Sequence, residues 1–388
     1  MLMHDSSSPL AIYDWYREMR TANPVFRDDV FNAWHVLRYE DVRAILSDPA
    51  TFQSDRPAFR RPPVDVYDPG EDTMARADGA RHRMLRGLVN QAFTPRVVER
   101  MEPRVRLLCD ELLDAVAQDG EMEVVADVAY PLPIRIVMEM LGVPAERSAE
   151  FRRWSNAVVS GGSGVADVGA DAEIDAMREF FAGVLADRRR TPGDDLISRL
   201  LAAESQGERL TERQLLNFCA LMLIAGHETT TSLIANTVYC LETVPGLLDL
   251  ARRDDCAPVP RVVDEVLRYA SPVQSVLRFA VADVELHGRR IKAGDTVFPF
   301  IGSANRDEAE FPQPDRFDIQ RPTGRGLAFG HGIHYCLGAP LARLEATIVV
   351  SEMLRRFPGK WLTRDVDADT SAPRFLFGIR RLPLTWEG

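Results

Sequence analysis

Apolar residues recur three and four positions apart along much of the chain, with polar residues between them. This spacing is typical of helices that bury one face. Apolar and polar residues instead alternate over 33–39 and within 281–297, which predicts short strands. The helical spacing predicts helices over 11–20, 40–46, 78–89, 97–117, 132–141 and 341–357.

The longest helical pattern covers 211–242 without a proline. It begins with Thr211 and Gln214, whose spacing matches a capping box. The segment is apolar nearly all round, so we expect its helix to cross the interior of the protein. A polar break at 225–231 interrupts it, and buried polar groups there need partners.

Glu228 and Thr229 lie in this polar break, just after the small residues Ala225 and Gly226. In a structural interpretation, Thr229 donates a hydrogen bond to a carbonyl one turn earlier, and Glu228 pairs with a neighbouring cation. The pattern alone leaves this structural role and a functional role equally open.

Composition limits the classes of protein that the chain can belong to. With 388 residues, 46% of them hydrophobic, it can bury a large core, and we find no linker between domains. A net charge of −11 argues against nucleic acid or an anionic membrane as the main partner. The N-terminus is polar, and no stretch approaches the ~20 consecutive apolar residues of a spanning helix. We therefore expect a cytoplasmic protein that does not bind membranes.

Five cysteines, odd in number and widely scattered, form neither a disulfide framework nor a zinc pattern. One of them, Cys336, lies among Gly330, Gly332 and Gly338, and Pro340 suits the first turn of a helix that follows. The N-terminus of such a helix stabilises a thiolate, which is the form of cysteine that binds metal. By itself, a lone cysteine is more often a small buried hydrophobic residue.

The segment around this cysteine resembles the haem-binding loop of the cytochrome P450 family. The residues that match the motif of that loop, with its spacing, are Phe329, Gly332, His334, Cys336 and Gly338. Five motifs occur in the order that this family has, over about 11–384. The resemblance implies the P450 fold, a single mainly α domain over 1–388 with small β-sheets at one end. It also implies that Cys336 binds the iron of haem b, where its electron donation favours cleavage of the O–O bond.

Further residues match positions that hold the haem in this family. His82 and Arg86 stand four apart and share a helix face. From spacing alone they form an ordinary basic helix, but the resemblance implies that they bind the haem propionates together with Arg278 and His334. Relatives often have another basic residue where this chain has Met84.

The polar break of the long helix matches the family's acid–alcohol pair. On this resemblance, Ala225 and Gly226 leave room for the haem and O2. Thr229 binds the distal oxygen, and Glu228 connects it to a source of protons.

Glu265 and Arg268 stand three apart on one predicted helix face. Such pairs are common and contribute only about 0.2–0.5 kcal/mol at a surface. Here they match the family's ExxR pair, and Arg316 is expected to complete a structural triad that holds the fold.

The expected substrate pocket is apolar to mixed. Val276 and Leu277, just before Arg278, and Leu376 and Phe377 near the C-terminus are its candidate lining residues. The proline-rich segment 55–77 is expected to border the pocket. The small-residue segment 160–171 predicts either a mobile lid or a connector.

The resemblance implies a monooxygenase that inserts one oxygen atom of O2 into a hydrophobic small molecule. No flavin or iron–sulfur sequence is fused to the chain, so a separate ferredoxin and its NAD(P)H-dependent reductase are the expected electron donors. A basic patch is their expected docking site: Arg81, Arg83, Arg104 and Arg343. Alternatives are a peroxygenase or redox-neutral haem–thiolate enzyme, and a non-enzymatic haem sensor or carrier.

Overall fold

The computed structural model divides into two compact units. Unit 1 comprises residues 1–52, 102–132 and 229–388, and unit 2 comprises 53–101 and 133–228. The prediction of a single domain therefore stays a prediction, and each unit is described by itself. The structure describes residues 9–56, 68–162, 170–204, 207–322, 324–368 and 375–387.

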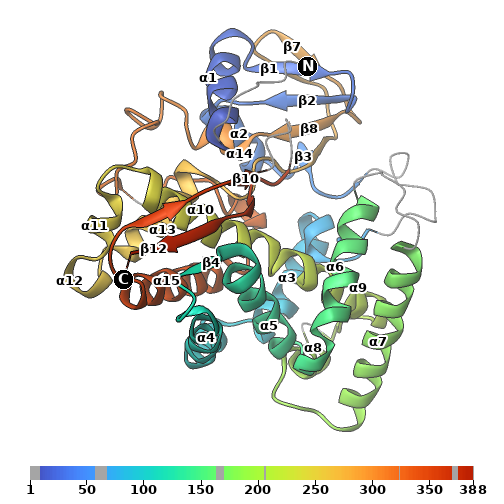
Figure 1. Ribbon diagram of the computed structural model, residues 1–388. Coiled ribbons are helices and arrows are strands. Elements are labelled where there is room, and N and C mark those ends of the chain that lie inside the picture. Colours follow the sequence, from blue (N-terminus) through green and yellow to red (C-terminus); the bar gives the residue numbers. More distant parts are fainter. Residues whose placement is uncertain are drawn as a thin grey trace. The chain divides into compact units, whose positions relative to one another are not determined.

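Among the described elements, unit 1 contains every strand except β3, and it contains α11 to α15; the ribbon in Figure 1 labels most of these elements. Its helices are α1 (Ile12–Ala22), α2 (Tyr39–Ser47), α11 (Leu247–Ala251), α12 (Arg253–Cys256), α13 (Val259–Tyr269), α14 (Ile301–Ala304) and α15 (Ala339–Arg356). Its strands are β1 (Val25–Asp28), β2 (Ala33–Val36), β4 (Glu121–Glu123), β5 (Arg278–Ala280), β6 (Val284–Leu286), β7 (Arg289–Ile291), β8 (Thr296–Pro299), β9 (Trp361–Thr363), β10 (Asp367–Ala368), β11 (Ile379–Arg381) and β12 (Pro383–Trp386).

Unit 2 is helical over most of its described residues. Four elements cross the boundary between the units: β3 (Phe52–Gln53), α4 (Pro95–Val116), α5 (Pro131–Met140) and α10 (Glu228–Thr243). Unit 2 itself contains α3 (Gly79–Ala92), α6 (Ser148–Gly162), α7 (Ala170–Arg190), α8 (Leu196–Ala202) and α9 (Glu212–Ala225).

The amphipathic patterns located the helices well and the strands only in part. The helices expected over 11–20, 97–117, 132–141 and 341–357 are confirmed to within a few residues as α1, α4, α5 and α15. The strand expected over 33–39 ends at Val36, because α2 already begins at Tyr39. Residues 163–169, at the centre of the expected lid, and 57–67, within the expected loop, lie outside the described residues.

A five-stranded sheet in the order β1-β2-β8-β5-β3 organises the N-terminal part of unit 1. Strand β2 pairs antiparallel with β1 and parallel with β8, which comes more than 250 residues later in the chain. Side chains alternate across the sheet. Trp34 and Val36 therefore join one buried cluster, while Ala33 joins a second cluster with Tyr16 of α1 and Phe300.

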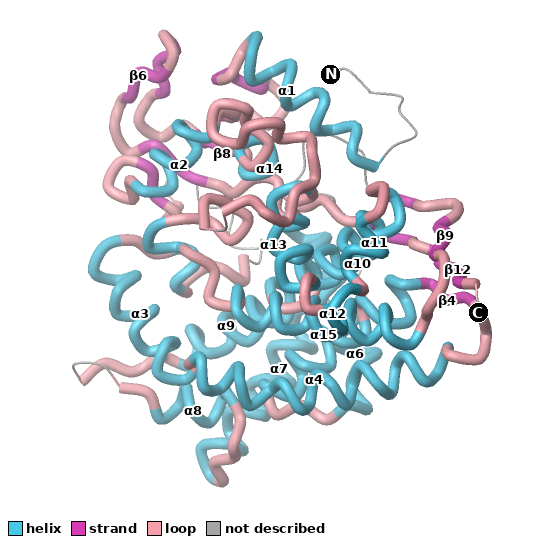
Figure 2. Tube along the Cα trace, turned by 90° about the vertical axis from the view of Figure 1, so that its left-hand side faces the viewer, coloured by secondary structure: helices cyan, strands magenta, loops and turns pink. Residues whose placement is uncertain are grey.

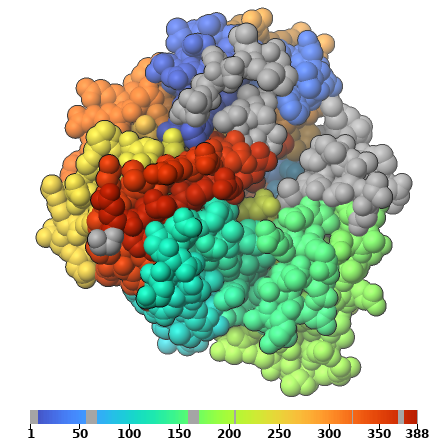
Figure 3. Space-filling model, in the orientation of Figure 1, coloured from blue at the N-terminus to red at the C-terminus, as the bar shows by residue number. Residues whose placement is uncertain are grey.

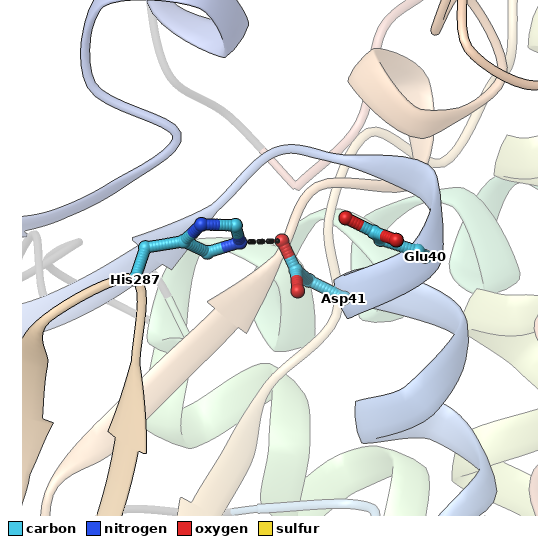
Figure 4. A group of neighbouring side chains, drawn as sticks. All are labelled: Glu40, Asp41 and His287. Atoms are coloured by element: carbon cyan, nitrogen blue, oxygen red, sulfur yellow. Dashed lines mark hydrogen bonds and ion pairs between the residues drawn. The ribbon is translucent and has the colours of Figure 1, made fainter.

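A hairpin next to this sheet is tied to α2 through one buried carboxylate. His287, in the turn between β6 and β7, has a positive φ of 48°, and its Nε2 lies 2.8 Å from Asp41 Oδ2 (Figure 4). Glu40 lies beside Asp41, so three potential metal-binding groups come within 4.8 Å of one another. The imidazole–carboxylate hydrogen bond suffices to explain this arrangement, which joins the hairpin to the helix.

Helices α13 and α15 lie side by side in unit 1, with α12 against α15 (Figure 2). The C-terminal segment, red in Figure 3, lies at the surface beside the yellow segment that contains α11 and α12. Arg252 fixes this arrangement, because its guanidinium donates hydrogen bonds to the carbonyls of Phe357 and Gly359.

The Glu265–Arg268 pair lies at the buried centre of unit 1. Arg268 donates two hydrogen bonds to the Glu265 carboxylate, at 2.9 and 2.7 Å, and both side chains are at most 5% exposed. The rest of the guanidinium donates to the carbonyls of Asn305, Pro314 and Arg316. The pair therefore fixes the irregular segment that leads to the cysteine loop.

The third member of this cluster is not the one expected. Arg316 contributes only its backbone carbonyl, and the residue itself is exposed. Arg321 instead places its Nε 3.3 Å from Glu265 Oε1. Its guanidinium also donates to three carbonyls, those of Pro312, Gln313 and Arg316. The prediction for Arg316 is wrong because a tight turn separates the two arginines, and spacing in the sequence does not reveal which one turns inward.

Arg321→Ala should lower the free energy of unfolding by roughly 1–3 kcal/mol, because it removes a partner of a buried carboxylate and hydrogen bonds to three carbonyls. Arg316→Ala is the matched control and should change it by less than about 0.5 kcal/mol, as for most exposed positions. Denaturant unfolding of both haem-bound variants measures the difference. Equal losses in the two variants would contradict the assignment of Arg321.

Candidate active site

Cys336 lies at the end of a tight loop, directly before a long helix. The loop closes through a hydrogen bond from the Cys336 amide to the Phe329 carbonyl at 2.9 Å. Gly338 caps α15, an 18-residue helix with a proline in its first turn. The thiol therefore lies close to the N-terminus of α15, where the helix dipole favours a thiolate, as the sequence predicted.

The loop is seated on two other elements of unit 1. Gly332 has a positive φ of 71°, and a Cβ there would lie 2.7 Å from the Leu46 carbonyl oxygen at the end of α2. On another side, the Arg343 guanidinium lies 4.5 Å from the centre of the Phe329 ring and donates a hydrogen bond to Asp264 of α13 at 2.8 Å. These contacts hold the loop that presents the thiol.

Cys336 differs from the other four cysteines of the chain, because it alone is exposed. Burial raises the pKa of the other thiols, to about 12 at Cys109 and Cys240, so these remain protonated and unreactive. An exposed thiol on a glycine-rich loop has space for a large ligand at the sulfur. The residues at this site therefore fit a haem bound through Cys336.

The expected propionate-binding residues are divided between the units. In unit 1, Arg278 begins β5, is buried and donates to the Leu277 carbonyl, and His334 is half-buried in a short 3-10 helix of the cysteine loop. In unit 2, His82 is buried on α3 and Arg86 is half-buried one turn later. Their roles as haem ligands stay a prediction.

The long helix is interrupted at the expected polar break. Thr211 and Gln214 form the predicted capping box, and α9 continues to Ala225. Residues 226 and 227 form a turn, and α10 begins at Glu228. A Cβ at Gly226 would lie 2.6 Å from Val137 Cγ2, so α5 packs directly against the backbone at the break.

Ala225 is exposed although Leu223 and His227, on either side of it, are buried. A small exposed residue in the middle of a core helix leaves open surface beside the acid–alcohol pair. Thr229 is half-buried in the first turn of α10. These features fit the expected positions of a planar cofactor and of O2.

Burial raises the pKa of the Glu228 carboxyl from its ordinary 4.5 to about 7. At neutral pH this group is therefore close to half ionised, and it can both donate and accept a proton. The carboxyl group thus has the properties that the family's acid requires.

The predicted substrate residues lie in two adjoining segments of unit 1. The Gln274 amide donates to the Phe375 carbonyl, and Val273 forms a bridge with Leu376, so the C-terminal segment does reach back to this region. A Cβ at Gly378 would lie 2.3 Å from Ser232 Oγ, one turn after Thr229.

The four predicted residues do not share one environment. Val276 packs against one buried cluster and Leu277 against the other, while Phe377 is itself buried against Tyr13. Their contact with substrate stays a prediction.

Two buried residues beside the break were not singled out from the sequence. His227 contacts the Leu223 carbonyl and Ser155 Oγ of α6. Ser155 is separated from His227 by 72 positions, and no periodicity of the sequence indicates that α6 crosses the break there.

The family model for cytochrome P450 matches residues 170–386. The chain is 39% identical to the erythromycin C-12 hydroxylase of Saccharopolyspora erythraea, over 96% of this chain and 94% of that protein. It is also 39% identical to the mycinamicin IV hydroxylase/epoxidase of Micromonospora griseorubida, with the same coverage of 96% and 94%. Among solved structures, it is similar to CYP109E1 from Bacillus megaterium in complex with testosterone, with a TM-score of 0.85 and 35% identity over 97% of this chain and 99% of that one.

The fold is mainly α with small β-sheets, and the cysteine loop fits a haem-binding site. The chain belongs to the cytochrome P450 family. Its cofactor is therefore haem b, and it is a monooxygenase, because its named relatives are P450 hydroxylases and epoxidases.

Glu228→Gln should stabilise the protein more at high pH than at low pH. Because the folded-state pKa is raised to about 7 from 4.5, ionisation of Glu228 destabilises the folded state progressively from pH 4.5 to pH 7 and fully above it. Glutamine removes this penalty, so the gain in unfolding free energy should rise to roughly 1–3 kcal/mol at pH 8. Denaturant unfolding at pH 5, 6 and 8 measures it.

Glu18→Gln, on the exposed side of α1, is the control and should show no such trend. A stability difference between Glu228→Gln and the wild type that is the same at pH 5 and pH 8 would contradict the raised pKa.

Proposed function

We propose that this P450 hydroxylates or epoxidises a hydrophobic small molecule, with electrons from a separate ferredoxin and an NAD(P)H-dependent reductase. The observation that carries the proposal is the position of Cys336. It is the exposed cysteine of the chain and lies at the N-terminus of α15, within the family's loop.

The relatives support a substrate that is hydrophobic but carries oxygen. Two relatives are named as hydroxylases of erythromycin and mycinamicin IV, and a similar structure holds testosterone. On this proposal, the segments around Val276, Leu277, Leu376 and Phe377 select the substrate. These residues differ in burial. Substitution of Val276 and Leu277, which are half-buried, would alter the choice of substrate with least damage to the fold.

We assign Cys336 as the proximal ligand and His82, Arg86, Arg278 and His334 as partners of the propionates. When bound, haem with a thiolate ligand supplies the activation of O2. The residues around it fix its orientation and exclude water from the substrate.

Proton delivery is assigned to Glu228 and Thr229. The pKa of about 7 lets the Glu228 carboxyl transfer protons at neutral pH. The Thr229 hydroxyl would hold the proton that comes from Glu228 close to the distal oxygen of O2. A peroxygenase would not need such a pair, and neither would a carrier, which argues for an enzyme that reduces O2.

The docking patch for the electron donor is less basic than the sequence suggests. Arg343 is bound to Asp264, and Arg81 pairs with Asp72. We therefore expect the exposed Arg83 to contribute more than Arg81 and Arg343 to the attraction of an acidic ferredoxin. A cytoplasmic location is proposed with this donor, because reduced ferredoxin and NAD(P)H are available there.

The long helical segment that contains the polar break is also strongly apolar. Within the described ranges, only 212–243 is long and apolar enough to cross a membrane, and more than half of its most apolar window is buried inside the protein. The core helix of a soluble protein has the same properties.

Cys336→Ser should abolish the strongly red-shifted Soret band that the dithionite-reduced protein shows with carbon monoxide, because serine does not supply a thiolate. Cys256→Ala removes a buried cysteine and is the matched control, in which the band should persist. Absorption difference spectra of the three proteins decide the matter. If the band survives in Cys336→Ser, the proximal ligand is another residue.

Thr229→Ala should retain haem but release most of the consumed electrons as hydrogen peroxide. Product per NAD(P)H should fall by roughly ten-fold or more, because a positioned proton donor is lost. The substrate for this assay is selected from steroids, macrolides and fatty acids by its shift of the Soret band.

Thr243→Ala is the matched control for this assay. Thr243 is an exposed threonine of the same helix that bonds to the Tyr239 carbonyl, and its loss should leave coupling unchanged. Coupling that is equal in wild type and Thr229→Ala would refute the assigned role.

A further inference from the structure

A buried hydrogen bond joins α6 to the interruption of the long helix. Ser155 Oγ lies 3.3 Å from His227 Nε2, and Nδ1 of the same ring lies 2.5 Å from the Leu223 carbonyl oxygen. Ser155 is 0% exposed and His227 is 1% exposed. All three residues belong to unit 2, so the contact lies within one compact unit.

The partners determine which nitrogen of His227 carries the proton. A carbonyl oxygen can only accept, so Nδ1 must donate its proton to Leu223. Burial lowers the pKa of the His227 imidazole to about 4, so the ring is neutral at physiological pH. Nε2 is then an acceptor, and the Ser155 hydroxyl donates to it.

The ring bonds to a carbonyl that also has a role in a continuous helix. In an α-helix the carbonyl of Leu223 would accept from the amide four residues later, which is that of His227 itself. Here the side chain of His227 reaches this carbonyl, and α5 packs against the neighbouring Gly226 backbone through Val137. His227 therefore belongs to the structure of the break rather than to the surface of a regular helix.

Helix α6 is fixed on its other side to α7. Two aromatic residues in the turn that precedes Ser155, Phe151 and Trp154, pack against Phe180 and Phe181 of α7. The distances between their ring centres are 5.2 to 6.4 Å. The three helices α6, α7 and α9 lie side by side in unit 2 (Figure 1). A displacement of α6 and α7 together would strain or break the Ser155–His227 hydrogen bond.

We propose that the Ser155–His227 hydrogen bond couples α6 to the break in the long helix and positions Glu228 and Thr229 for proton delivery. Glu228 directly follows His227 in the chain, so the backbone that the imidazole fixes is the one that orients the carboxyl. Ser155 and His227 are positioning residues, and they act through the acid–alcohol pair. The inference rests on the proton-delivery role assigned under the proposed function.

The first test is hydrogen–deuterium exchange of the haem-bound protein, which needs no substrate. Ser155→Ala should raise amide exchange over 224–231 by roughly 2- to 10-fold, the factor expected for the loss of one neutral hydrogen bond. His227→Asn removes the imidazole that makes both this contact and the bond to Leu223, so it should raise exchange at least as much. The double variant should match His227→Asn, because the Ser155 contact is already lost in that variant.

Thr237→Val is the matched control. It removes a buried hydrogen bond from the same long helix, to the Leu233 carbonyl, but that bond has no partner on α6. Exchange over 224–231 should stay at the wild-type value in this variant. Unchanged exchange in Ser155→Ala, or additive effects of the two single variants, would overturn the coupling.

The second test is 15N NMR of histidine-labelled wild type in the diamagnetic ferrous carbon monoxide form. One of the seven imidazoles should be protonated at Nδ1 and keep that state from pH 5.5 to pH 8.5. The 15N chemical shift of its Nε2 should change in Ser155→Ala. If every imidazole titrates in this range, or the one perturbed by Ser155→Ala is protonated at Nε2, the inference is wrong. This test does not require that the His227 variant fold.

Turnover separates this inference from the proposed function. With the substrate used for Thr229→Ala, Ser155→Ala should raise the peroxide share of consumed NAD(P)H by roughly 2- to 10-fold, with KM unchanged. If Thr229→Ala uncouples turnover and Ser155→Ala does not, the coupling of α6 is refuted and proton delivery stands. If neither variant uncouples, the proton-delivery role itself fails.

Discussion

The buried ion pair between Glu265 and Arg268 is the interaction on which the presentation of Cys336 depends. Burying two charges is costly, and the cost is offset only when every donor and acceptor is used. Arg268 meets this requirement by donating to the carboxylate and to three backbone carbonyls between Asn305 and Arg316. The irregular chain before the cysteine loop has no regular hydrogen-bond ladder of its own, so this guanidinium takes the place of one.

The second constraint is the interruption of an otherwise apolar helix. A break in the middle of a core helix exposes backbone groups that must find partners. The imidazole of His227 satisfies one of them, and Gly226 allows α5 to approach where a side chain would collide. The same interruption places an acid with a raised pKa and a hydroxyl in the first turn of α10. The structural need of the helix and the proton delivery that we propose therefore coincide at one position of the chain.

The differences between expectation and structure have a common cause. The pattern of residues correctly placed a structural cluster around Glu265 and Arg268 but assigned Arg316 to it, whereas Arg321 is the arginine that approaches the carboxylate. Val276 and Leu277 are neighbours that pack against different clusters, because successive side chains of extended chain point to opposite sides. In irregular or extended segments, one step along the chain changes the direction of a side chain completely.

The sequence by itself determined the main helices, through helical periodicity and the positions of glycine and proline, and its motifs determined the family. It also predicted the axial cysteine and the acid–alcohol pair through the resemblance of those motifs. Only the tertiary structure decided which arginine joins the buried cluster, that Cys336 alone among the cysteines is exposed, and that Ser155 reaches His227. These properties depend on contacts between segments tens to hundreds of residues apart. Burial and pairing at such separations are set by packing, which local patterns do not encode.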